Sequence, residues 1–64
     1  MLTYNITDYE HDEAGNDLIE INGVCLSSDT KPTSGIVNGS ILTEMDTGTV
    51  YMYDQAGAQW LSVV

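Results

Sequence analysis

The sequence is poorest in positive charge. Its 64 residues include ten acids but a single basic side chain, Lys31, which gives a formal net charge of −9. Lysine and arginine are the side chains that neutralise nucleic-acid phosphates and anionic lipid headgroups. We therefore expect neither nucleic-acid nor membrane binding, and a basic protein surface or a cation is the better match.

Cysteine and long apolar runs are also scarce. Cys25 is the only cysteine, so no disulfide can form within the chain. It lies between Val24 and Leu26, which predicts a packed thiol and not a nucleophile. No apolar run approaches the roughly 20 residues of a membrane span. No basic segment leads into an apolar stretch, so we expect no signal peptide.

Helical periodicity is missing, and strand-like runs take its place. We expect a single all-β domain over residues 1–64, built as a small antiparallel sheet. A domain of this size buries only about 60% of its unfolded surface, so small domains often need help from a partner. We therefore expect a homo-oligomer or a subunit of a larger assembly.

The C-terminal residues 40–64 carry the clearest pattern. Three runs rich in β-branched and aromatic residues are predicted strands: 40–45, 49–54 and 59–63. The connectors between them end at Gly48 and Gly57, which fits turns whose last position needs a positive φ. Short connectors make neighbouring strands antiparallel, so we predict a three-stranded meander.

The first half of the chain is predicted from weaker signals. Residues 1–17 are acidic and have little to bury, which predicts a solvated arm or loop with at most a short strand. Within residues 18–28, the dipeptide Asn22-Gly23 separates two short apolar runs and predicts a tight hairpin turn. Residues 27–35 are rich in turn residues and are predicted to be a surface loop.

No side chains assemble into a recognisable catalytic or metal site. Asp8, Glu10, Asp12, Glu13 and Asp17 cluster around one histidine, but their spacing does not match a calcium-binding EF-hand loop, and a solvated loop is the better interpretation. No nucleophile, base and orienting group can be placed together. We expect no enzyme, no cofactor and no bound metal.

Three aromatic residues, Tyr51, Tyr53 and Trp60, are the candidate partner-binding residues. If exposed, they would suit a protein interface or a sugar-stacking surface. If buried, they are the core of a domain that has no phenylalanine, and this second interpretation fits the needs of a small domain better.

The segment from Gly39 to Asp54, closed by Trp60, resembles a hairpin signature of small bacteriophage virion proteins. In those proteins a strand ending in Asp-Thr is followed by Gly, by a strand that alternates apolar and aromatic residues, and by a Trp. The stretch from Asp29 to Ser40 is similar to the sequence that precedes this signature. The resemblance covers residues 29–60, and it implies a structural protein of the head, fibre or tail, without catalytic residues.

Taken with the composition, the resemblance predicts a small capsid-associated subunit of decoration or head-fibre type, assembled in the host cytoplasm and present in the phage particle. Its partner would be a capsid protein or another virion protein. Two alternatives stay open. An acidic inhibitor could mimic nucleic acid in a host defence enzyme, since the net charge is −9. A carbohydrate-binding tip could use the three aromatic residues.

Overall fold

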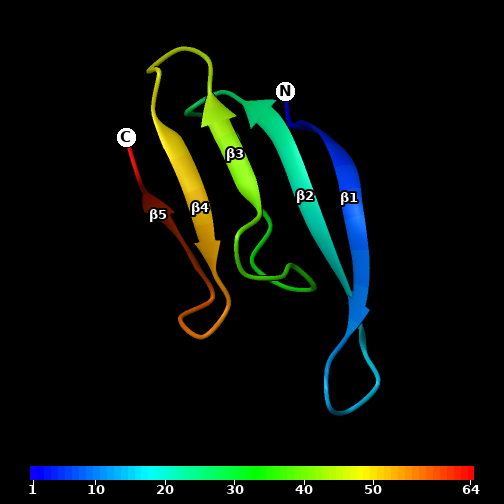
Figure 1. Ribbon diagram of the computed structural model, residues 1–64. Helices are drawn as coiled ribbons and strands as arrows, with labels where there is room; N and C mark the ends of the chain where they lie inside the picture. The colour runs from blue at the N-terminus through cyan, green and yellow to red at the C-terminus, as the bar shows by residue number, and fades with distance from the viewer.

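The computed structural model describes residues 1–64 and forms one five-stranded sheet in the order β1-β2-β3-β4-β5, with no helix (Figure 1). The all-β prediction is confirmed. The strands are β1 (Thr3–His11), β2 (Asp17–Cys25), β3 (Ile41–Glu44), β4 (Val50–Asp54) and β5 (Gln59–Ser62).

The C-terminal strands follow the predicted meander. β3 pairs antiparallel with β4, and β4 pairs antiparallel with β5. Gly48 has a φ of 75° in the first turn, as its position predicted. In the second turn the positive φ lies at Ala58 (50°) and not at Gly57, so that part of the prediction was wrong.

The predicted acidic arm is largely a strand. β1 pairs with β2 in an antiparallel hairpin, and the register shifts by one residue between Ile6 and Asp8. This β-bulge breaks the alternation along β1, which is why the pattern indicated no long strand. The remaining loop, residues 12–16, is closed by Asp12, whose Oδ1 accepts hydrogen bonds from the backbone N–H groups of Ala14 and Asn16 at 2.9 Å each.

The hairpin predicted within residues 18–28 does not form. Asn22 and Gly23 lie inside the continuous strand β2 and pair with β1. Gly23 opposes Tyr4 at a very close approach: a Cβ atom on Gly23 would lie 2.2 Å from the carbonyl oxygen of Thr3 and 2.5 Å from the Cβ of Tyr4. Gly23 therefore allows two strands to approach closely and does not form a turn.

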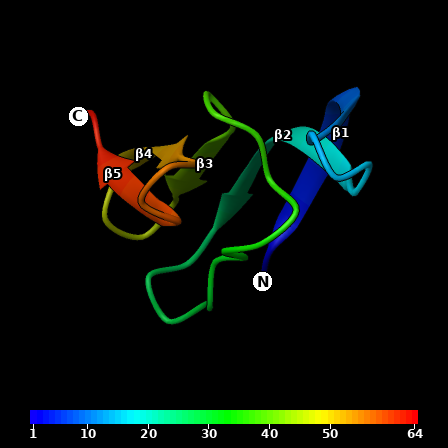
Figure 2. The ribbon, with the colours of Figure 1, turned by 90° about the horizontal axis from the view of Figure 1, so that it is seen from below.

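The sheet is mixed, which corrects the prediction of a purely antiparallel sheet. β2 and β3 run parallel, and the connection formed by residues 26–40 joins them. A parallel pair requires such a crossover. The connection stands out from one side of the sheet (Figure 2) and then pairs with β2, where Ile36 bridges Ile19.

The core lies between the connection and the sheet. Five buried side chains form its centre: Ile21, Cys25, Ile36, Leu42 and Tyr53. The connection supplies Ile36, and it also buries Val37. The buried Ser40 hydroxyl accepts a hydrogen bond from the backbone N–H of Ile21 at 3.0 Å. The crossover thus serves as the second layer that a single sheet needs.

Candidate interaction surface

The two faces of the sheet differ in what covers them. We call the side under residues 26–40 the covered face and the opposite side the open face. Leu42 and Tyr53 point to the covered face and are buried. Their strand neighbours point to the open face, because successive side chains on a strand alternate. Nothing in the chain covers the open face of β3, β4 and β5.

The three predicted partner-binding residues lie on the covered face. Tyr53 is 4% exposed, and its ring centroid lies 5.0 Å from that of Trp60. The Tyr53 hydroxyl donates to the carbonyl of Thr33, and the Trp60 Nε1–H donates to the carbonyl of Pro32, both at 2.8 Å. These contacts match the core alternative given by the sequence. They lend no support to a sugar-binding tip, and a role in partner binding stays a prediction.

The third aromatic residue, Tyr51, belongs to a polar cluster at the same face. Lys31 Nζ lies 4.5 Å from the centroid of the Tyr51 ring and 2.6 Å from Glu44 Oε2. Thr47 Oγ1 donates to the other carboxylate oxygen of Glu44 at 2.8 Å. The hydrogen bond from Lys31 holds the pKa of Glu44 below its usual value, and the pKa of Lys31 is raised in return.

No local sequence pattern indicates this pair. Lys31 and Glu44 are 13 positions apart, and they meet only because the connection folds back over the sheet. The chain's single basic side chain is thereby used inside the fold, with its side chain only 15% exposed. The outer surface is left with almost no positive charge.

An apolar group of side chains occupies the open face of the meander. Ile41 pairs with Met52, and Met52 pairs with Leu61, so these three form a row across β3, β4 and β5. Val63 lies in the next row beside Val50, whose carbonyl accepts its N–H at 2.9 Å. We call these five residues the meander patch.

The meander patch is accessible. Met52 is 38% exposed, Leu61 47% and Val63 51%. Exposed apolar side chains that gather on one face are typical of a contact surface, whereas single ones are ordinary. Strand alternation sets Met52 opposite Tyr51 and Tyr53, and sets Leu61 and Val63 opposite Trp60, but the sequence does not show which face the chain itself covers.

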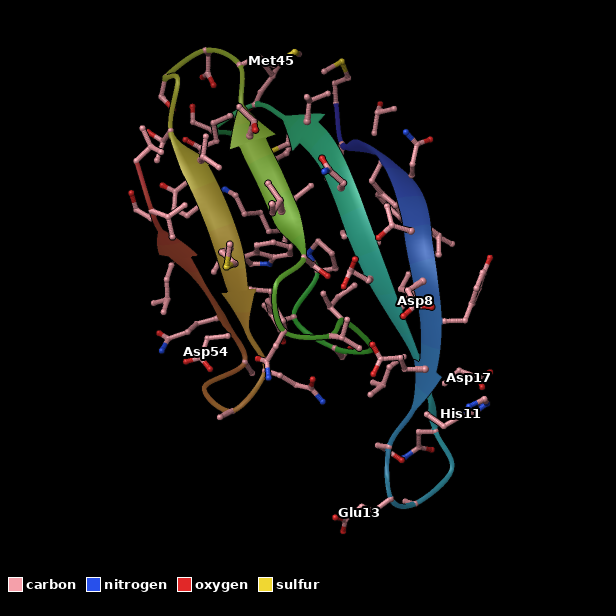
Figure 3. All side chains as sticks on the ribbon, in the orientation of Figure 1. Asp8, His11, Glu13, Asp17, Met45 and Asp54 are labelled. Carbon is pink, nitrogen blue, oxygen red and sulfur yellow. The ribbon has the colours of Figure 1, made fainter.

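Nine of the ten acids fall into two groups, and the tenth, Asp54, lies at the end of β4. Four are held by hydrogen bonds that lower their pKa values, chiefly bonds from Asn16 to Asp12, from the chain's amino group to Asp29, from Lys31 to Glu44 and from Ser27 to Asp46. Five others lie on the β1–β2 hairpin: Asp8, Glu10, Glu13, Asp17 and Glu20. Figure 3 labels Asp8, Glu13 and Asp17.

The hairpin group has almost no positive neighbour. His11 Nε2 lies 3.1 Å from Asp17 Oδ1, and neither lysine nor arginine occurs in residues 1–25. Asp8 and Glu20 oppose each other across the two strands. The end of the molecule that holds β1 is therefore strongly negative, and the predicted solvated acidic loop shrinks to residues 12–16.

No pocket opens in the surface, and no three His, Cys, Asp or Glu side chains converge as metal ligands would. The structure has no helix with the length and hydropathy needed to cross a membrane. No protein family, characterised protein or solved structure matches this chain.

Proposed function

We propose that this chain is a small capsid-associated subunit of a bacteriophage virion, which acts by attaching to a capsid protein. The observation that carries the proposal is the meander patch. An apolar centre with a polar rim is the usual anatomy of a protein–protein contact surface. Here the rim carries acids on the same face, Glu20 within β2 and Asp54 at the end of β4.

The sequence resemblance supports the same role. It covers residues 29–60, and most of these residues form the connection and the meander. The residues that resemble the virion signature therefore include most of the connection and three residues of the meander patch, Ile41, Val50 and Met52, whereas Leu61 and Val63 lie beyond them. A capsid protein with an apolar surface and basic neighbours is the partner that this patch fits.

The first test is attachment to capsids purified from the phage that encodes the chain. We expect the chain to co-sediment with capsids in a gradient, and to be detected in purified virions by mass spectrometry. Virions that contain no copy of the chain would refute the proposal.

The second test locates the contact. Met52→Glu places a charge in the meander patch and should weaken capsid binding at least tenfold. The matched control is Met45→Glu, because Met45 is 52% exposed but lies in the β3–β4 turn. Equal loss of binding in both variants would show that the meander patch is not the contact.

A second function has one observation in its favour. Acids on the β1–β2 hairpin form a negative surface with no lysine or arginine, which suits an inhibitor that occupies the basic nucleic-acid site of a host enzyme. Such binding should weaken steeply with salt. If the chain inhibits a nuclease at low salt and does not bind capsids, this second function is favoured.

A further inference from the structure

The strand β1 is a long and unprotected sheet edge. It is nine residues long, every one of them is exposed, and it pairs only with β2. Edge strands are usually protected by proline, lysine, short length or a bulge. β1 has the bulge but contains no proline and no lysine. The other edge strand, β5, has only four residues.

The hydrogen bonds of β2 reveal which groups of β1 face outward. Ile21 donates its N–H to Ser40, and Ile19 donates its N–H to the carbonyl of Gly35, both on the side away from β1. Opposite residues of an antiparallel pair exchange both backbone bonds or neither. The residues of β1 that oppose them, Ile6 and Tyr9, therefore turn their N–H and C=O groups toward the free edge.

One of these outward groups is already satisfied locally. The N–H of Tyr9 donates to Oδ1 of its neighbour Asp8 at 2.9 Å. The backbone of Ile6 has no such side-chain partner. The same reasoning places the outward groups of Tyr4 on the free edge, because Tyr4 opposes Gly23 on β2. The stretch from Tyr4 to Ile6 is thus the open template of the edge.

Side chains on the two faces of β1 have opposite character. Tyr4, Ile6 and Tyr9 lie on the covered-face side and are 41%, 41% and 71% exposed. Asp8 and Glu10 lie on the open-face side, next to Glu20 and Leu18 of β2. A strand added to this edge would meet apolar side chains on one face and carboxylates on the other.

The negative charge of β1 determines which kind of strand can pair with this edge. A second copy would bring the same acids against the edge, and like charges opposite each other in a sheet are destabilising. An extended segment that carries lysine or arginine would instead pair with carboxylates, such as Asp8 and Glu10, that have no lysine or arginine partner within the chain.

We propose that β1 takes up an extended segment of a partner protein as a sixth strand, and that this segment alternates apolar and basic residues. The inference rests on the proposed attachment function, since it gives the chemistry of the capsid segment, but it uses a surface separate from the meander patch. Backbone bonds to Tyr4 and Ile6 would provide affinity, and the alternation would set the register.

The test uses the whole chain, labelled with ¹⁵N, and a synthetic nonapeptide that alternates lysine and valine. We expect the Ile6 amide to gain protection from hydrogen exchange when the peptide is added. The Asn5 amide should not change, because it faces β2. A peptide that alternates glutamate and valine should not bind, and neither should a peptide with the lysines and valines in separate blocks.

Two charge reversals locate the effect. Glu10→Lys and Asp54→Lys change the net charge equally, but Asp54 lies on β4, away from the edge. We expect Glu10→Lys to weaken peptide binding at least tenfold and Asp54→Lys to change it less than twofold. Equal effects would overturn the proposal, and so would protection of Ile6 that grows with protein concentration alone, which would mean pairing with a second copy.

The outcome is separable from that of the proposed function. If Glu10→Lys still binds capsids as tightly as the original chain and the peptide gives no protection of Ile6, the edge proposal fails while attachment stands. If the chain never binds capsids but the lysine–valine peptide protects Ile6, attachment fails and the edge remains a binding site for a basic strand.

Discussion

At the residue scale, Gly23 is the position where an added methyl group meets the least tolerant neighbours. A Cβ there would approach backbone and Cβ atoms of β1, which cannot rotate away. We expect Gly23→Ala to lower the free energy of unfolding by about 1–3 kcal/mol, as overpacking usually does. Urea denaturation measures the change.

The control for that substitution is Gly57→Ala. A Cβ at Gly57 would approach the side-chain ends of Gln59 and Asp54, which can move. Its effect should stay within about 0.5 kcal/mol. If both glycines tolerate alanine equally, β1 and β2 do not approach each other as closely as the structure indicates.

The Lys31–Glu44 pair makes a second prediction at this scale. Lys31→Met would leave the Glu44 carboxylate buried without its cation. The melting temperature should therefore fall by about 10 °C. The pKa of Glu44 is lowered in the folded protein, so ionised Glu44 adds to the free energy of unfolding. This stabilisation is fully present above the ordinary glutamate pKa of 4.5, and it is lost as the pH falls through the folded-state pKa.

Removal of Lys31 also removes the largest cause of the lowered pKa of Glu44, while the hydrogen bond from Thr47 remains. The difference in melting temperature between the original chain and Lys31→Met should therefore narrow as the pH falls from 7 to below 4.5. A difference that stays constant with pH would mean that Lys31 stabilises the fold through its packing on Tyr51 and not through its charge.

At the scale of elements, the connection of residues 26–40 is the least regular part of the fold, and two aromatic side chains fasten it. Tyr53→Phe keeps the ring but removes the hydrogen bond to Thr33. We expect a loss of about 1 kcal/mol in the free energy of unfolding. Tyr9→Phe, at an exposed position, is the control and should change nothing. Equal effects would mean that the Tyr53 hydroxyl contributes no net stability.

Trp60 has a larger role in the same contact. Trp60→Ala removes the ring that packs on Tyr53 and the hydrogen bond to Pro32. The side chain is partly buried, so we expect a loss of about 3 kcal/mol, the lower end for removal of a large aromatic group. Thermal unfolding followed by circular dichroism measures it, and a change near zero would contradict a core role.

The elements also explain how far the sequence could predict this fold. The meander depends on local signals, such as the turn glycine Gly48 and the alternation along β4, and its strands were predicted within about one residue. The β1–β2 hairpin was missed because a bulge interrupts its alternation. The prediction of a hairpin turn at Asn22-Gly23 was wrong because this dipeptide suits both a tight turn and a close approach of two strands.

Contacts between residues far apart in the sequence could not be predicted from local sequence patterns. The parallel pairing of β2 with β3 and the Lys31–Glu44 bond both depend on how the crossover packs. The same holds for the candidate surface. Alternation sorted Met52 and Leu61 from Tyr53 and Trp60, but only the position of the connection decides which of these two sets is covered.

At the scale of the whole molecule, charge repulsion opposes folding. The net charge is −9, and the single lysine is already paired inside the fold. Salt screens repulsion between surface charges, with a Debye length that falls from about 30 Å at 0.01 M to about 10 Å at 0.1 M. We expect the melting temperature at pH 7 to rise over this range of sodium chloride. A fall would mean that ion pairs outweigh the repulsion.

The buried thiol of Cys25 has a practical consequence. Cys25 is the last residue of β2, and its side chain is fully buried in the core. Burial raises the pKa of the thiol, so the reactive thiolate is scarce in the folded protein. An alkylating reagent can reach the sulfur only while the core around the end of β2 is open. The rate of labelling therefore measures how often the core opens. Slower labelling in a complex would show how much a bound partner stabilises the closed sheet.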